Sequence, residues 1–202
     1  KSLDRLKGAI DCAHAINAKN ICGPFHSAFA TFTGKPPEED EYRWSSEVLH
    51  AAGDYAASAQ ITLTLEALNR FECYLCNTVE HLVKLVKLTN HLNVKAMFDT
   101  HHANMEEKKY ANALKLIAPY LGHVHISEND RGTPGDGHIP WDETFSTLAT
   151  IKYKGWLTIE AFTRNDPDFA NAINVWREYS KPWDMATNGI NFIKNMIIKH
   201  KL

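Results

Sequence analysis

The chain has 202 residues, of which 44% are hydrophobic and 23% charged, a balance typical of globular proteins with enough length for a sizeable core. Its 22 Lys and Arg residues against 24 Asp and Glu residues give a net charge of −2, which argues against general binding to nucleic acid or to a membrane surface. No apolar run approaches the roughly 20 residues of a membrane span, and no secretory signal is visible, so we expect a cytoplasmic protein.

The chain opens with apolar residues at helical spacing, and Ser2 is the expected cap of this first helix. Five short runs then have the composition of β-strands, at 20–25, 61–66, 94–99, 122–127 and 155–160. Further helices are predicted at 80–92, 105–121, 142–152, 168–180 and 186–200. Asn104 is the expected N-cap of the helix at 105–121, because acidic residues follow it in the first turn, where the helix dipole favours negative charge.

Strands that alternate with helices are typical of βαβ units, which place the strands in a parallel sheet. The predicted fold class is therefore α/β. Five parallel strands fit either an open sheet or the later part of a closed (β/α)8 TIM barrel. The residues at the ends of the strands favour the barrel.

Each of the last four predicted strands carries, at or near its carboxyl end, a side chain that can bind a metal or transfer a proton. These side chains are Glu66, Asp99, His125 and Glu160. In a parallel barrel all the carboxyl ends of the strands lie on one face, where active sites are built, so the four should converge. A lone glutamate at a strand end is usually solvated and a lone strand histidine usually belongs to the core, but repetition on four successive strands favours a shared site. Its oxygen-rich ligands suit Mn²⁺, Mg²⁺ or Co²⁺ better than structural zinc.

Two histidines, His123 and His125, are two residues apart and therefore share one face of their predicted strand. His125 is nearer the carboxyl end and is the better metal ligand, whereas His123 is expected to lie deeper in the barrel. The strand thus predicts one ligand, not two.

The four cysteines are Cys12, Cys22, Cys73 and Cys76, and the last two form a CxxC motif in "CYLC". On its own this motif suggests redox or zinc chemistry. No second pair or suitably spaced histidine follows closely, and the neighbours are apolar. Packed thiols in a reducing compartment are therefore the favoured interpretation.

Four stretches together carry a family resemblance: "LEALNRFE" (65–72), "DTHHANMEE" (99–107), "HVHISENDRGTPGDG" (123–137) and "TIEAF" (158–162). In this order and with these separations they resemble the ketose 3-epimerases, the D-tagatose 3-epimerase and D-psicose (D-allulose) 3-epimerase family within the xylose-isomerase-like TIM barrels. The similarity runs from about residue 20 to the end of the chain, and "GPFHSAF" and "VWREY" fit it as well.

The resemblance implies an isomerase that epimerises free ketohexoses or ketopentoses at C3 through a cis-enediolate. One divalent cation, Mn²⁺ in preference to Co²⁺ or Mg²⁺, would be held by the four strand-end residues, and Glu66 and Glu160 would also be the catalytic acid–base pair. Glu72, His102 and Arg131 match residues that hold the substrate; outside the resemblance they would be interpreted as a surface carboxylate, a loop histidine and a surface ion pair. The family also implies a homodimer or homotetramer.

The loop after the predicted strand at 122–127 contains turn-forming glycines and a proline that would bring Arg131 back over the site. Glu128 and Asp130 flank this turn. They would either orient Arg131 or remain solvated.

Members of the family have about eight strands, and the five predicted here match strands 4 to 8. We therefore expect residues 1–202 to form a single TIM-barrel domain that is N-terminally truncated and represents the C-terminal portion of the barrel. Three alternatives stay open: an aldose–ketose isomerase on the same scaffold, an inactive truncated fragment, and a metal-dependent AP endonuclease of related fold. The last would need more histidine ligands and a basic groove, for which the net charge of −2 offers no support.

Overall fold

The computed structural model describes residues 1–178 and 180–202, and this part of the chain forms two compact units. Unit 1 comprises Lys1–Phe98 and Leu116–His123, and unit 2 comprises Asp99–Lys115 and Val124–Leu202. The strand pairings described within each unit are parallel, which confirms the predicted α/β class. None of the helices in the described ranges combines the length and the apolar character that a membrane span requires.

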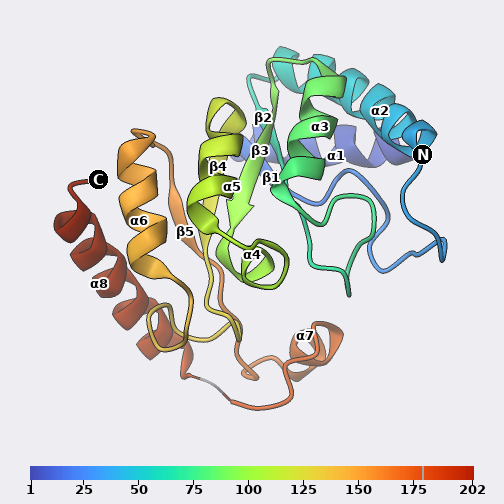
Figure 1. The fold of residues 1–202 in the computed structure, drawn as a ribbon. Helices are drawn as coiled ribbons and strands as arrows, with labels where there is room; N and C mark the ends of the chain where they lie inside the picture. Colours follow the sequence, from blue (N-terminus) through green and yellow to red (C-terminus); the bar gives the residue numbers. More distant parts are fainter. Residues whose placement is uncertain (179) are drawn as a thin grey trace. The chain divides into compact units, whose positions relative to one another are not determined.

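Unit 1 contains three strands, β1 (Asn20–Gly23), β2 (Thr62–Leu65) and β3 (Val94–Asp99), of which β3 ends on the first residue of unit 2. Strand β2 pairs in parallel with β1 on one side and with β3 on the other. The helices of unit 1 are α1 (Ser2–Ala15), α2 (Glu39–Ser58) and α3 (Val79–Thr89). Helix α2 packs between α1 and α3 (Figure 1) and also contacts β2.

The core of unit 1 is built from branched apolar side chains of the strands and of α3. The largest fully buried ones include Ile61, Leu63, Leu65, Leu82 and Leu85. Burying a side chain of this size contributes roughly 1.5–3 kcal/mol relative to leaving it exposed. Strand β2, which ends immediately before Glu66, is therefore held rigidly in place.

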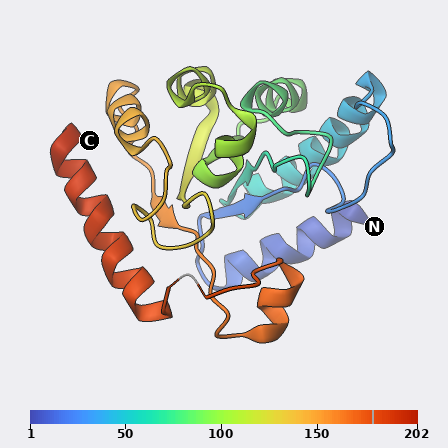
Figure 2. The same ribbon diagram turned by 60° about the horizontal axis from the view of Figure 1, so that its bottom comes forward.

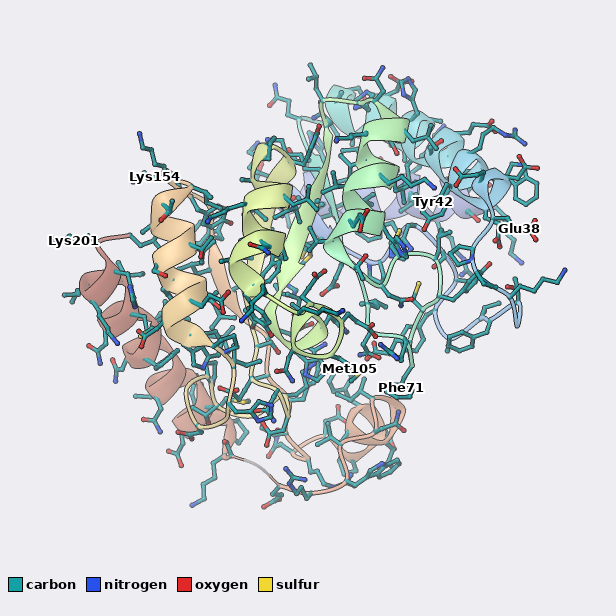
Figure 3. All side chains as sticks on the ribbon, viewed as in Figure 1. Glu38, Tyr42, Phe71, Met105, Lys154 and Lys201 are labelled. Atoms are coloured by element: carbon teal, nitrogen blue, oxygen red, sulfur yellow. The ribbon has the colours of Figure 1, made fainter. Side chains whose placement is uncertain are left out.

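Helix α2 was not among the predicted helices, because small residues form much of its buried face and weaken its apolar periodicity. At Gly53 an added Cβ would lie 2.6 Å from the His91 ring, so only glycine permits this close packing. The start of α2 is well defined: the N–H of Glu38 donates to the Glu41 carboxylate over 2.8 Å, half of a capping box. Tyr42, which Figure 3 labels beside Glu38, donates from its hydroxyl to the Leu75 carbonyl at 2.8 Å.

Unit 2 contains the end of β4 (Leu121–Ile126), whose first three residues belong to unit 1, and β5 (Leu157–Ile159). The helices of unit 2 are α4 (Thr100–Glu106), most of α5 (Tyr110–Ile117), α6 (Trp141–Thr150), α7 (Pro167–Ala172) and α8 (Pro182–His200). The last two residues of α5 and the 3₁₀ turn that follows it (Ala118–Tyr120) belong to unit 1. Helices α6 and α8 lie side by side in both Figure 1 and Figure 2, and α8 also contacts β5.

All five predicted strands are present. Strand β4 begins one residue before its predicted range, and the other four strands lie inside theirs. Three helical predictions were wrong in detail. Ser2 is the first helical residue of α1, not its cap, because Lys1 takes the N-cap position. The helix predicted at 168–180 ends at Ala172 in α7, with residue 179 outside the described residues.

The third error is the single helix predicted at 105–121 with Asn104 as its cap. Asn104 lies inside α4, which Asp99 caps by accepting hydrogen bonds from two backbone N–H groups. Glu107 then adopts an extended conformation (φ −97°, ψ 130°), and a second helix begins at Tyr110. A strand residue that caps the next helix competes successfully with a later asparagine because its carboxylate is already fixed.

Candidate active site

Unit 2 brings together three of the predicted metal ligands. Asp99 ends β3, His125 is the penultimate residue of β4, and Glu160 follows β5 directly. The Nδ1 atom of His125 lies 3.1 Å from Oε2 of Glu160 and 3.4 Å from Oδ2 of Asp99. The potential ligand atoms of the three side chains all lie within 4.8 Å of one another.

Strand geometry explains how His125 and Glu160 meet. Val124 and Ile126 are fully buried, so the alternate residue His125 points to the opposite face of β4. The parallel register pairs Ile126 with Ile159, and the N–H of Glu160 donates to the Ile126 carbonyl at 3.2 Å. Glu160 is thereby fixed one residue beyond the end of β5, beside the histidine.

Asp99 performs two tasks with its two carboxylate oxygens. Oδ1 accepts from the N–H groups of His101 (2.7 Å) and His102 (3.0 Å) as the N-cap of α4, which leaves Oδ2 to face His125 and Arg131. Complete burial would raise the pKa of Asp99, but the charge of Arg131 and the hydrogen bond with His125 hold this pKa well below its usual range. The carboxylate is therefore ionised at neutral pH.

Arg131 lies across the site and forms ion pairs with both carboxylates. One of its terminal nitrogens lies 2.6 Å from Oε2 of Glu160, 3.3 Å from Oδ2 of Asp99 and 2.8 Å from the Ser127 hydroxyl. The other donates to Nε2 of His102 at 2.9 Å. This arrangement agrees with the prediction that the loop brings Arg131 back to the strand ends. Arg131 belongs to a buried network and does not form a surface ion pair.

The ring of His102 is neutral in this network. Burial is the main reason, and the nearby guanidinium of Arg131 adds to it; together they lower the pKa of His102 to about 3 despite the opposing charge of Asp99. Because Arg131 can only donate, Nε2 of His102 accepts and the ring proton resides on Nδ1.

This depressed pKa predicts a pH dependence of stability in chelator-treated protein. Folded His102 stays neutral down to about pH 3, whereas an unfolded histidine takes up a proton near its ordinary value of 6.5. Below that pH the unfolded state binds one more proton than the folded state. The free energy of unfolding therefore decreases as the pH is lowered, by up to about 1.4 kcal/mol per pH unit. Urea denaturation between pH 7 and pH 4.5 measures the slope. His102→Asn should have a shallower slope, and equal slopes in the two proteins would contradict the assignment.

The donor set in unit 2 fits a divalent cation. Two carboxylates and one imidazole supply hard oxygen and borderline nitrogen ligands, the kind preferred by Mn²⁺, Co²⁺ and Mg²⁺. The guanidinium of Arg131 already contacts both carboxylates, which indicates that this position stabilises positive charge. The charge and the chemistry of these side chains therefore match those of a metal centre.

The other two predicted site residues belong to unit 1. Glu66 follows β2 and is buried; its N–H donates to the Gly23 carbonyl at 3.0 Å, and the Nε2–H of His26 donates to its carbonyl at 2.8 Å. Glu72 is half-buried, and its Oε1 accepts from the Asn69 amide at 2.8 Å. The backbone of Glu66 is thus held on both sides.

Two residues of these networks were not identified as site residues from the sequence. Ser127, the first residue after β4, continues the alternation of His123 and His125, so the period of two was a signal that could have identified it. Its hydroxyl donates to the Glu160 carbonyl at 2.6 Å and accepts from Arg131. His26 lies in a loop with no such alternation, and the stretch "GPFHSAF" that contains it did not distinguish it as a site residue.

The CxxC cysteines are free thiols, as are the other two cysteines. Cys73 and Cys76 are both buried, in agreement with packed thiols. Burial raises the pKa of Cys76. For Cys73, burial is outweighed by the hydrogen bond and the charge interaction with His26 and by the hydrogen bond with Ser27, which lower the pKa to about 7.

Parallel βα units with carboxylates and a histidine at the carboxyl ends of their strands define the class: an α/β protein with a candidate metal centre of the barrel type. A sequence model of the xylose isomerase-like TIM barrel family matches residues 1–184. The chain belongs to this family.

Curated relatives carry the name D-psicose 3-epimerase. The one from Agrobacterium fabrum is 34% identical over 172 residues, which cover 85% of this chain and 60% of the relative. The one from Ruminiclostridium cellulolyticum is 38% identical over 153 residues, covering 76% of this chain and 52% of the relative. The chain thus spans less than two thirds of these relatives.

A solved structure of a D-allulose 3-epimerase from Methylomonas sp. superposes with a TM-score of 0.91 at 30% identity, over 96% of this chain and 69% of that protein. The fold of this chain is therefore similar to that of the Methylomonas protein over the aligned residues.

Proposed function

We propose that this chain carries the active site of a ketose 3-epimerase, which inverts C3 of a free ketohexose or ketopentose. One divalent cation, Mn²⁺ in preference to Co²⁺ or Mg²⁺, would be held by Glu66, Asp99, His125 and Glu160. The observation that carries the proposal is the meeting in unit 2 of Asp99, His125 and Glu160 with Arg131.

Two further points support Glu66 as the fourth ligand. It is buried directly after a parallel strand, as Glu160 follows β5. In a TIM barrel the carboxyl ends of all strands belong to one face, so residues at equivalent strand ends serve one site. A second glutamate also provides what inversion at carbon needs, a proton-transferring group for each face.

Epimerisation requires removal of the C3 proton and its return to the opposite face. One of Glu66 and Glu160 takes the proton as a carboxylate, and the C–H electron pair moves toward the C2 carbonyl to give a cis-enediolate. The other, protonated at the start, delivers its proton to the opposite face of C3 and ends as the carboxylate. The bound cation would supply Lewis-acid stabilisation of negative charge on the sugar oxygens. The two glutamates exchange roles in the reverse reaction.

The remaining residues would hold the sugar. Arg131 offers several N–H donors to hydroxyl and carbonyl oxygens, and Glu72 offers acceptors to sugar hydroxyls. His102, neutral in its present surroundings, can donate from Nδ1 without adding charge. Assembly as a homodimer or homotetramer remains a prediction from the family, and a cytoplasmic location remains a prediction from the sequence.

Incubation with D-fructose, D-tagatose and L-ribulose tests the proposal. We expect C3 epimers in the presence of Mn²⁺, none after EDTA treatment, and recovery when Mn²⁺ is restored. Aldose products would instead favour a C1–C2 isomerase. The absence of products from the chain and from a version extended to the length of its relatives would refute the assignment.

A further inference from the structure

Glu128 lies two residues beyond β4, and its carboxylate is the centre of a loop that the proposed mechanism leaves unexplained. The side chain is buried, at 1% exposure. Oε1 accepts from the N–H groups of Asn129 (3.1 Å) and Ile139 (3.2 Å). Oε2 accepts from the N–H of Gly135 (2.9 Å) and from the indole N–H of Trp141 (3.1 Å).

Three of these donors are spread along the loop between β4 and α6, and the fourth, Trp141, is the first residue of α6. The loop wraps so closely around the carboxylate that an added Cβ at Gly137 would meet Oδ1 of Asn129 at 2.1 Å and Oε1 of Glu128 at 2.5 Å. One buried carboxylate thus ties this segment together through four hydrogen bonds, alongside the buried side chains of Ile139 and Trp141.

The backbone of Glu128 connects the same loop to the active site. Its carbonyl accepts from the N–H of Arg131 and from Nδ1 of His101, both at 3.1 Å. Arg131 itself has a left-handed backbone (φ 64°), which costs a non-glycine residue on the order of 1 kcal/mol and persists only where the surroundings impose it. Glu128 supplies much of that surrounding structure.

We propose that Glu128 is a positioning residue for Arg131: its carboxylate fixes the loop so that the Arg131 guanidinium is held against Asp99, Glu160 and His102. The catalytic part of this inference rests on the proposed function, in which Arg131 binds the sugar. Glu128 itself would touch neither sugar nor cation.

Glu128→Gln tests the carboxylate with almost no change in volume. In either orientation of the new amide, its NH₂ group faces two N–H donors, so two hydrogen bonds are lost and two donors are left opposed. Asp130→Asn is the matched control, because Asp130 lies in the same loop but pairs on the surface with Arg177 and accepts only from the Gly132 N–H within the loop.

Residue-resolved hydrogen–deuterium exchange reads out the loop without requiring activity. In Glu128→Gln we expect the amides of Gly135, Ile139 and Arg131 to exchange at least about tenfold faster than in the parent chain, while Asp130→Asn leaves Ile139 and Arg131 unchanged. Unchanged exchange at Arg131 in a folded Glu128→Gln variant would overturn the proposal. If that variant does not fold, Trp141→Phe takes its place, because it deletes one donor and keeps the carboxylate. We expect a smaller acceleration of exchange at the same amides, and the absence of any acceleration would argue against the proposal.

A double-mutant cycle connects the loop to catalysis. Glu128→Gln should raise the KM for the ketose by about tenfold, and in an Arg131→Ala background the same change should have less than about a twofold effect. Additive effects would mean that Glu128 acts by general stability alone. Should the parent chain epimerise no ketose, the proposed function fails, and the exchange rate of the Arg131 amide still decides whether Glu128 positions that residue.

Discussion

Glu160→Gln is expected to lower kcat/KM for C3 epimerisation by about 10³-fold, because it removes the proton-transferring group on one face of the carbon. The amide keeps the size of the side chain and an oxygen toward His125. Initial rates of epimer formation with Mn²⁺ measure the loss. Glu47→Gln is the control: Glu47 lies exposed on α2 in an ion pair with Arg43, and its loss should leave the rate within about twofold of the parent, since such surface pairs contribute little.

Comparing Glu160→Gln with Glu66→Gln in D₂O distinguishes the loss of a proton-transferring group from the loss of a metal ligand. Each variant retains one glutamate, so each should exchange the C3 proton of one epimer with solvent deuterium while forming almost none of the other epimer. The two variants should act on opposite epimers. Loss of exchange from both epimers in either variant would show that the glutamate only holds the cation or the fold.

Asp99→Ala is expected to lower the free energy of unfolding of the metal-free protein by up to about 3–5 kcal/mol, because it removes one of the two carboxylates that pair with the buried charge of Arg131 and leaves only Glu160. The same change also removes the cap of α4. Urea denaturation after EDTA treatment measures the total.

Asp166→Ala isolates the capping contribution. Asp166 caps α7 in the same way, by accepting from the N–H groups of Asp168 and Phe169 at 3.1 Å, but it is exposed and lies outside the buried network. Its loss should cost only about 1 kcal/mol. If Asp99→Ala costs no more than Asp166→Ala, the buried ion-pair network around Arg131 contributes nothing to stability, contrary to our description.

The strands and the candidate ligands could be predicted from the sequence because both depend on short-range patterns. A run of β-branched and apolar residues ends on Asp99 or just before Glu160, and parallel topology then places such ends together. The same topology explains why His125 rather than His123 meets Asp99 and Glu160, since it lies nearer the carboxyl end of β4.

The helices around the site were harder to predict, because their limits depend on contacts distant in sequence. Asp99 was identified as a ligand, yet its second role as the cap of α4 moved the start of that helix five residues earlier than predicted. Helix α2 escaped prediction because its packing at Gly53 relies on the absence of a side chain.

The loop after β4 shows the same limit. Its turn residues indicated that Arg131 returns to the site, but the sequence left Glu128 as either an orienting or a solvated carboxylate. Only the three-dimensional path shows four donors converging on it from as far along the chain as Trp141.

Anomalous diffraction from crystals of the chelator-treated protein soaked in Mn²⁺ is the most direct test of the central claim. We predict a single strong manganese peak bonded to oxygens of Glu66, Asp99 and Glu160 and to a ring nitrogen of His125, at about 2.0–2.3 Å. A peak elsewhere, or a manganese ion that Glu66 does not contact, would contradict the account.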